Sequence, residues 1–135
     1  MLVKLPSLNQ IIIIGELVDD PAWVKLESGD EVVNFVIVCN RRYQSSKTHK
    51  WKVKTLFVQV VAWKTLAQSC KEYLSRGAGV LVKGELEQSY WTSKDGRKRS
   101  KLQILAERVD FLSRKGDQEP VEGEVEHKQP VAVPE

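Results

Sequence analysis

Residues 53–91 read VKTLFVQVVAWKTLAQSCKEYLSRGAGVLVKGELEQSYW. Residues 53–63 are rich in β-branched and aromatic side chains, which is typical of a strand. The apolar period then changes to that of an amphipathic helix, and Gly77 provides a stop for it. The apolar positions of this helix are Leu66, Ala67, Cys70, Tyr73 and Leu74. Residues 79–91 return to a strand pattern, so the stretch predicts one helix between two long strands.

Strand patterns continue upstream of this stretch. Residues 10–18 form an apolar, β-branched run that we expect to bend at Gly15, and residues 22–27 form a shorter run. Residues 31–43 alternate between two faces, which is typical of a half-buried strand. One of these faces carries Val33, Phe35, Ile37 and Cys39. Residues 44–52, QSSKTHKWK, are polar, and we interpret them as a hairpin loop.

A last strand, residues 98–112, follows the turn signal Asp95-Gly96. With the short run set aside, the order is three long strands, a helix and two long strands. That order is the arrangement of the OB-fold, a five-stranded, partly open Greek-key barrel. Gly15 and Gly84 suit strands that bend sharply to close a small barrel. We therefore predict an all-β protein with an OB-fold domain over residues 1–115.

The segment 116–135 has a different composition. It contains three prolines, scattered acidic residues and no aromatic residue, which predicts a disordered tail. Six acidic residues and one lysine give residues 117–135 a charge of −5, which leaves +8 on residues 1–116. A basic body with an acidic tail indicates a polyanionic partner for the body.

Aromatic residues are interleaved with basic ones in two places. Tyr43 follows two arginines and Trp51 lies among lysines, with no acidic residue between positions 44 and 55. Trp91 precedes a basic hairpin. Unpaired bases stack on aromatic rings while cations follow the phosphates, so we predict these three residues as stacking platforms for single-stranded DNA. The predicted phosphate contacts are Arg41, Arg42, Lys47, Lys50, Lys52, Lys54, Lys94, Arg97, Lys98 and Arg99.

The sequence pattern assigns the roles of the remaining aromatic residues less clearly. Trp63 fits a stacking platform and packing between strand and helix equally well, and Trp23 stays undecided. Phe35, Phe57 and Phe111 lie in apolar strand runs, and the pattern favours the core for them.

No motif of an enzyme or of a metal site is present. The chain lacks G-x-S-x-G, Walker and GxGxxG motifs, Cys39 and Cys70 form no CxxC pair, and neither His49 nor His127 has a second ligand at metal spacing. We therefore expect no catalysis, no cofactor and no metal, with both thiols buried in a reducing compartment. No apolar run approaches the roughly 20 residues that span a bilayer. Residues 1–10 have no signal-peptide pattern, so we expect a cytoplasmic, nucleoid-associated protein with no membrane partner.

Four sequence blocks carry a resemblance to a known family. They are LNQIIIIGELVDDP, EVVNFVIVCNRR, FVQVVAWKTLAQSCKEYLSRGAGVLVKGEL and YWTSKDGRKR. In order and spacing they resemble the bacterial-type single-stranded DNA-binding protein (SSB) family: its opening strand, its VANF-type second strand, its WGKLAE-x-YL-x-KG helix segment and its last basic hairpin. The resemblance covers residues 8 to about 114.

The resemblance implies an OB-fold protein, usually a homotetramer, that wraps single-stranded DNA during replication, recombination and repair. By local alignment, the base-stacking aromatic residues of the family fall on Tyr43, Phe57, Trp63 and Trp91. The resemblance thus gives Phe57 a stacking role that its pattern alone does not indicate, and it favours the platform interpretation of Trp63.

Two segments depart from the family pattern. The family often has arginines on the strand before the hairpin tryptophan, where this chain has Glu87-Gln88-Ser89, so we expect weaker phosphate contact there. The family tail usually ends in aspartates followed by Ile-Pro-Phe, whereas this sequence ends in Val131-Ala132-Val133-Pro134-Glu135. We therefore expect weak recruitment of replication and repair proteins through the tail.

Two other functions remain open from the sequence. An OB-fold adaptor subunit of a primosome-like assembly acts mainly through protein partners. An OB domain can also bind RNA, in which case contacts to the 2′-hydroxyl discriminate RNA from DNA. Strong, salt-sensitive binding to oligo(dT) distinguishes the single-stranded DNA-binding function from the adaptor function.

Overall fold

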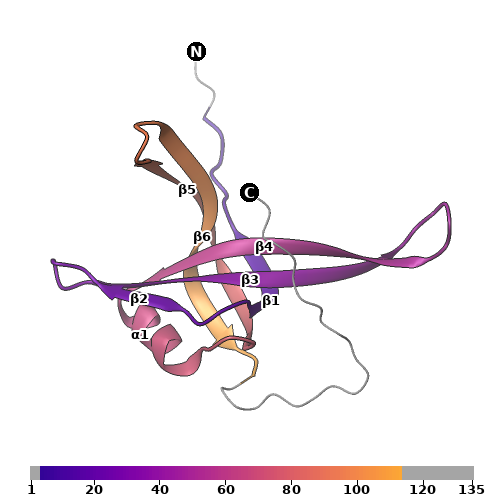
Figure 1. The fold of residues 1–135 in the computed structure, drawn as a ribbon, viewed down its shortest axis with the longest axis horizontal. Helices are drawn as coiled ribbons and strands as arrows, with labels where there is room; N and C mark the ends of the chain where they lie inside the picture. The colour runs from indigo at the N-terminus through magenta and orange to yellow at the C-terminus, as the bar shows by residue number, and fades with distance from the viewer. Residues whose placement is uncertain (1–3, 114–135) are drawn as a thin grey trace.

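The computed structural model describes residues 4–113 of the chain. These residues form a β-barrel with one helix and two projecting hairpins (Figure 1). The elements are β1 (Ile11–Leu17), β2 (Ala22–Lys25), β3 (Glu31–Gln44), β4 (Trp51–Trp63), α1 (Lys64–Tyr73), β5 (Gly79–Thr92) and β6 (Lys98–Phe111). The predicted disordered tail, 116–135, and the domain boundary at residue 115 lie outside the described residues.

The strand order confirms the predicted OB-fold. The sheet runs β1-β5-β6-β4-β3-β2, and an additional pairing of β1 with β3 closes its first five strands into a barrel. All pairings are antiparallel except β4–β6, where Val60 is opposite Ile104. The short strand β2 extends the sheet beyond β3 without taking part in the closure. The barrel therefore has five strands, as predicted.

Two glycines allow the backbones to approach where the barrel closes. A Cβ atom at Gly15 would lie 2.8 Å from the carbonyl oxygen of Val38, and one at Gly84 would lie 2.1 Å from that of Leu105. A β-bulge falls between Lys83 and Gly84, where β5 bends away from the barrel. The bends that the sequence predicted at these glycines are thus sites of close backbone contact.

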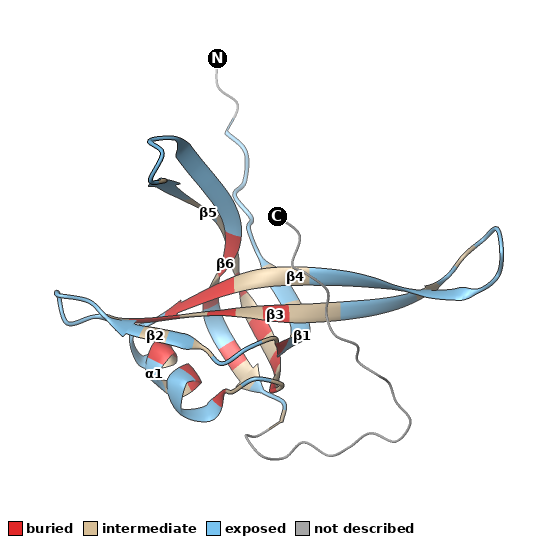
Figure 2. Ribbon diagram, viewed as in Figure 1, coloured by how far each residue is buried: buried red, intermediate tan, exposed pale blue. Residues whose placement is uncertain are grey.

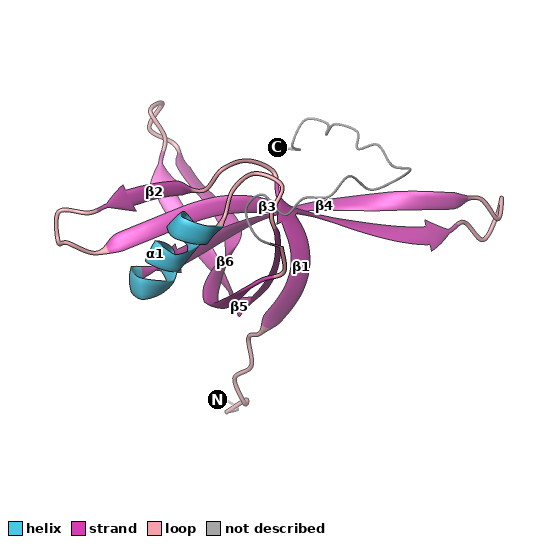
Figure 3. Ribbon diagram, turned by 90° about the horizontal axis from the view of Figure 1, so that it is seen from below, coloured by secondary structure: helices cyan, strands magenta, loops and turns pink. Residues whose placement is uncertain are grey.

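The core fills the barrel and the space under the helix. Val33, Phe35 and Ile37 point inward from β3 and are buried, as their alternation predicted, whereas Cys39 is only partly buried. Helix α1 packs against β2, β3, β4 and β6 at one end of the barrel (Figure 3). Its buried side chains, with the residue that follows it, are Ala67, Cys70 and Leu74. This helix is too short and polar to cross a membrane, and the described residues contain no other helix.

The structure corrects the prediction for Phe111. This side chain lies at the end of β6 and is 36% exposed, so it belongs to the rim of the barrel and not to its core. Its ring centroid lies 5.6 Å from that of Tyr73, which is itself 51% exposed although its helical spacing placed it among the apolar positions. The two rings cover each other because both elements end at this rim.

Two hairpins extend beyond the barrel, and we refer to them as the β3–β4 arm (residues 40–55) and the β5–β6 arm (residues 88–102). Figure 2 shows that buried residues are concentrated in the barrel while both arms are exposed. The β3–β4 arm is longer than the sequence predicted, because Gln44 pairs with Trp51 and only residues 45–50 form the loop. Trp51 is therefore a strand residue, and its position on the ladder fixes the face on which it lies.

Candidate nucleic-acid interface

The register of β3 and β4 determines which aromatic residues share a face, since residues opposite each other in a ladder point to the same side. Phe35 lies opposite Val60, and both point into the barrel. Phe57 lies opposite Val38, and this pair is three positions, an odd number, along the ladder from the inward-pointing Phe35–Val60 pair. Phe57 therefore points outward. The same phase places Trp63 and Trp51 on the outer face, where they are 39% and 61% exposed. Three of the predicted stacking residues thus share one face of this ribbon.

Tyr43 lies on the other face of the β3–β4 arm. It pairs with Lys52, in phase with the inward-facing residues of the barrel. On this face the Lys54 ammonium lies 5.8 Å from the centroid of the Tyr43 ring. On the opposite face the Arg42 guanidinium lies 5.2 Å from the centroid of the Trp51 ring. Each face of the arm therefore carries one aromatic ring with a cation beside it.

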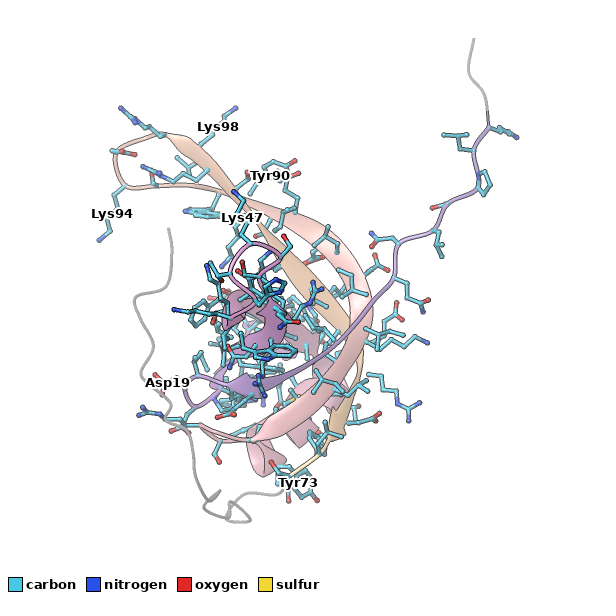
Figure 4. The ribbon with its side chains drawn as sticks, turned by 90° about the vertical axis from the view of Figure 1, so that its right-hand side faces the viewer. Asp19, Lys47, Tyr73, Tyr90, Lys94 and Lys98 are labelled. Carbon is cyan, nitrogen blue, oxygen red and sulfur yellow. The ribbon has the colours of Figure 1, made fainter. Side chains whose placement is uncertain are left out.

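The β5–β6 arm separates its two neighbouring aromatic residues in the same way. Trp91 pairs with Arg99 on one face, whereas Tyr90 pairs with Ser100 on the other face and is 73% exposed. Figure 4 shows Tyr90 on this arm, with Lys94 and Lys98 near the arm's end and Lys47 near the end of the other arm. The predicted basic residues thus lie at the tips and along the strands of both arms.

Lys101 connects the Trp91 face to the outer face of β4. Its ammonium lies 5.7 Å from the centroid of the Trp91 ring and donates a hydrogen bond to Gln59 Oε1 at 3.4 Å. Gln59 in turn donates to Asn34 Oδ1 at 3.4 Å. Because Phe57 is two residues from Gln59 on the same face, a continuous surface joins the Phe57 and Trp91 rings. A polar floor of Asn34, Gln59 and Lys101 lies along this surface.

None of the three floor residues was among the predicted site residues. Asn34 and Gln59 are uncharged positions within apolar strand runs, and Lys101 lies in a basic hairpin without an adjacent aromatic residue. Their only signal in the sequence is strand phase, since Asn34 and Gln59 alternate with buried residues. The contact between Gln59 and Lys101 depends on the parallel pairing of β4 with β6, which strand patterns do not reveal.

The two arms differ in their acidic residues. Residues 32–71, which include the whole β3–β4 arm, contain no aspartate or glutamate. In the β5–β6 arm, the Asp95 carboxylate lies 3.8 Å from Arg97 Nε and 3.6 Å from Arg99 Nη2. A hydrogen bond from Ser93 and another from the Arg97 backbone N–H hold the pKa of Asp95 below its usual value. This persistent negative charge partly offsets two of the predicted phosphate contacts.

Trp23, undecided from the sequence, lies away from this surface. Its Nε1 donates to Glu31 Oε1 at 2.9 Å, and the Lys71 ammonium of α1 lies 3.6 Å from its ring centroid. Gln68 also donates to Glu31, and these hydrogen bonds lower the pKa of that carboxyl. The cluster fastens the helix to the β2–β3 hairpin, so we interpret Trp23 as a structural residue.

The geometry offers no reactive centre within residues 4–113. No group of three or more histidine, cysteine or carboxylate side chains there is placed to hold a metal ion. Both cysteines are free. Burial raises the pKa of the Cys70 thiol to about 12 and also raises that of Cys39. Both thiols therefore stay protonated and weakly nucleophilic near neutral pH.

Comparison with known proteins places this surface in context. The model of the "Single-strand binding protein family" matches residues 8–112. "Single-stranded DNA-binding protein 2" of Chlorobaculum tepidum is 41% identical over 125 residues, which cover 90% of this chain and 84% of that protein. "Single-stranded DNA-binding protein" of Aquifex aeolicus is 38% identical over 107 residues, which cover 79% and 71% of the two chains.

A solved structure shares the fold as well. The "Plasmodium falciparum SSB complex with ssDNA" superposes with a TM-score of 0.75 at 25% sequence identity. The superposition covers 82% of this chain and 100% of that one.

Proposed function

The chain belongs to the single-strand binding protein family, and from this membership we propose that it binds and protects single-stranded DNA during replication, recombination and repair. Proteins of this family are non-enzymatic, in agreement with the absence of catalytic motifs from the sequence. Binding is largely independent of base sequence because it depends on stacking and on phosphate contacts.

One observation carries the proposal: a single surface links the Phe57 and Trp91 rings through the Gln59–Lys101 hydrogen bond. Stacking on an aromatic ring contributes about 1–3 kcal/mol per base in single-strand-binding OB-folds. Every base has a π-face, so stacking tolerates any sequence, whereas paired bases in a duplex are already stacked on each other. The acid-free β3–β4 arm supplies cations for the phosphates that flank these bases.

A titration of tryptophan fluorescence tests this function. Oligo(dT) should quench the emission, because Trp91 and Trp63 lie on the proposed surface, and a duplex of equal length should bind far more weakly. The logarithm of the affinity should fall linearly with the logarithm of the salt concentration, by about 0.7 per neutralised phosphate. Equal affinity for duplex and single strand contradicts the proposal. A competition with a matched RNA oligomer separates DNA binding from RNA binding.

We further propose that four copies assemble through their sheets, so that one DNA strand contacts several barrels. Support comes from β1, whose outward side chains Ile12 and Ile14 are 61% and 59% exposed. One edge of β1 pairs with β5. Along the opposite edge, β1 pairs with β3 only at Glu16 and Leu17, and the rest of that edge has no strand partner among the described residues. An exposed apolar strand with an open edge favours association with another strand.

Light scattering tests the assembly. Four chains of 15.4 kDa give a particle of about 60 kDa. Linked binding sites raise the apparent affinity for a long strand through effective concentration, so long oligomers should bind far more tightly than short ones. A mass near that of one chain, unchanged when DNA is added, contradicts the tetramer but leaves the proposed binding of single strands untouched. No feature of residues 4–113 favours the adaptor function over DNA binding.

A further inference from the structure

A carboxylate, Glu87, lies on the proposed DNA surface and forms no ion pair with the residues that the structure describes. Glu87 of β5 pairs with Gln103 of β6, and both residues share the face of Trp91. Gln103 is only 7% exposed, and its Nε2 donates to Glu87 Oε2 at 2.9 Å. Glu87 itself is half-buried. The buried amide thus fixes the carboxylate on the Trp91 face of β5, four positions before Trp91.

Glu87 differs in this respect from Asp95, the carboxylate of the β5–β6 arm. Asp95 has two arginines within 4 Å, whereas no ion pair of Glu87 is formed within residues 4–113. Its nearest cation along the ladder, Lys101, donates instead to Gln59. The other oxygen of Glu87, Oε1, accepts no hydrogen bond from the described residues. Glu87 is therefore an uncompensated hydrogen-bond acceptor that faces the DNA path.

The neighbouring floor residues do not discriminate among bases in the same way. The amides of Asn34 and Gln59 each offer a donor and an acceptor, so they can adapt to any base edge. Lys101 only donates, but every base presents at least one acceptor to it. A carboxylate only accepts, and bases differ in whether they present an amino group: cytosine has its N4 amino group where thymine has the O4 oxygen.

We propose that Glu87 selects bases that carry an amino group, and that it favours cytosine over thymine at one nucleotide bound on the Trp91 face of β5. The inference rests on the proposed binding of single-stranded DNA. Glu87 and Trp91 are four positions apart on β5, about 13 Å at the usual rise. The selected base is therefore a different one from the base that stacks on Trp91. The N4 amino group donates to the carboxylate, whereas the O4 oxygen of thymine meets it as a second acceptor.

The test compares oligo(dC) and oligo(dT) of equal length at one salt concentration, with the full chain and with its Glu87→Gln variant. Glutamine has the same shape and keeps an oxygen for Gln103, so the fold is retained. We expect the variant to bind oligo(dT) more tightly and to gain less for oligo(dC). The preference for cytosine relative to thymine should fall about fivefold, which corresponds to about 1 kcal/mol for one base contact.

Two controls separate base selection from general repulsion of phosphate. Glu72→Gln removes the same charge from an exposed position on α1 and should leave the cytosine-to-thymine ratio unchanged. An oligomer whose cytosines lack the N4 amino group should lose the preference with the wild-type chain. An equal gain for both oligomers in Glu87→Gln, or an unchanged ratio, overturns the inference while single-strand binding stands. Failure of the wild-type chain to bind either oligomer contradicts the proposed function itself.

Discussion

The two arms are built alike but carry different chemistry. The β3–β4 arm has no acidic residue and places an aromatic–cation pair on each face, Tyr43 with Lys54 and Trp51 with Arg42. The β5–β6 arm has a carboxylate at its tip, Asp95, and Glu87 directly precedes the arm on β5. A surface without acidic residues attracts phosphates along its whole length, whereas fixed carboxylates repel phosphates at particular positions. We infer that the β3–β4 arm mainly attracts the DNA by its charge, and that the β5–β6 arm mainly determines where the DNA lies.

The two arms also differ in how they are attached to the barrel. Beyond the barrel, the β3–β4 arm continues as a regular antiparallel ladder. On the other hairpin, β5 bends at a bulge before the β5–β6 arm, where Gly84 packs against the Leu105 backbone. The Asn9 side chain fastens it further, accepting from the Leu86 N–H and donating to the Leu86 carbonyl oxygen, both at 2.8 Å. We infer that the second arm is held more rigidly against the barrel than the first.

The largest effect is expected at the root of the β5–β6 arm. Gly84→Ala places a methyl group 2.1 Å from a carbonyl oxygen, so the backbone must move. The free energy of unfolding should fall by about 3 kcal/mol, the upper part of the range for overpacking. Gly79→Ala on the same strand is the control, because its methyl group meets its nearest atom, Ser113 Oγ, at an ordinary 3.5 Å. Urea unfolding of both variants measures the difference, and equal stabilities contradict the tight root.

The two adjacent aromatic residues of the β5–β6 arm provide the next test. Trp91→Ala should weaken binding to oligo(dT) by about 1–3 kcal/mol, because it removes the ring that we propose supports a stacked base. Tyr90→Ala should weaken it much less, since Tyr90 lies on the opposite face, away from Lys101 and Gln59. Equilibrium titrations measure both affinities. If Trp91→Ala lowers the thermal stability but leaves the affinity unchanged, Trp91 is a packing residue and the platform assignment is wrong.

The sequence was sufficient for the barrel but not for the faces of the arms. Strand alternation, the single helix and the two bending glycines predicted the OB-fold, because each depends on local pattern. The faces of Tyr43 and Trp51 depend on the register across the loop, which extends over residues 45–50 and not over the predicted 44–52. Without that register, the two residues could not be placed on opposite faces.

Contacts between distant strands explain the rest of what was missed. The Gln59–Lys101 bond joins residues 42 positions apart across a parallel pair, and no local pattern encodes it. Phe111 was predicted as core because its neighbours are apolar, but β6 ends there and leaves the ring at the rim. Glu87 was recognised as a departure from the family, whereas its support by a buried amide came only from the structure.

Neutralising one cation in each arm compares their contributions to phosphate binding. Lys52→Gln, in the acid-free arm, should lower the slope of log affinity against log salt by about 0.7, the value for one phosphate contact on a single strand. Arg97→Gln should lower it less, because Asp95 already lies 3.8 Å from that guanidinium. Salt titrations with oligo(dT) give both slopes. Equal reductions contradict the view that Asp95 offsets the arginine charge.

The smallest effect is expected from Asp95→Asn, which tests the same offset from the other side. The amide keeps an oxygen to accept from Ser93 and from the Arg97 N–H, so the tip retains its turn while Arg97 and Arg99 lose their anionic neighbour. Both arginines are exposed, and exposed pairs contribute at most about 1 kcal/mol, so stability should hardly change. The affinity for oligo(dT) should rise about twofold at low salt, and the gain should fade at high salt. Acidification is no substitute for the variant, because the pKa of Asp95 lies below its usual value and the charge persists as the pH falls through the usual range. A salt-independent gain contradicts the electrostatic offset. A loss of affinity shows that Asp95 instead orients the arginines toward the phosphates, and the second arm then contributes charge as the first does.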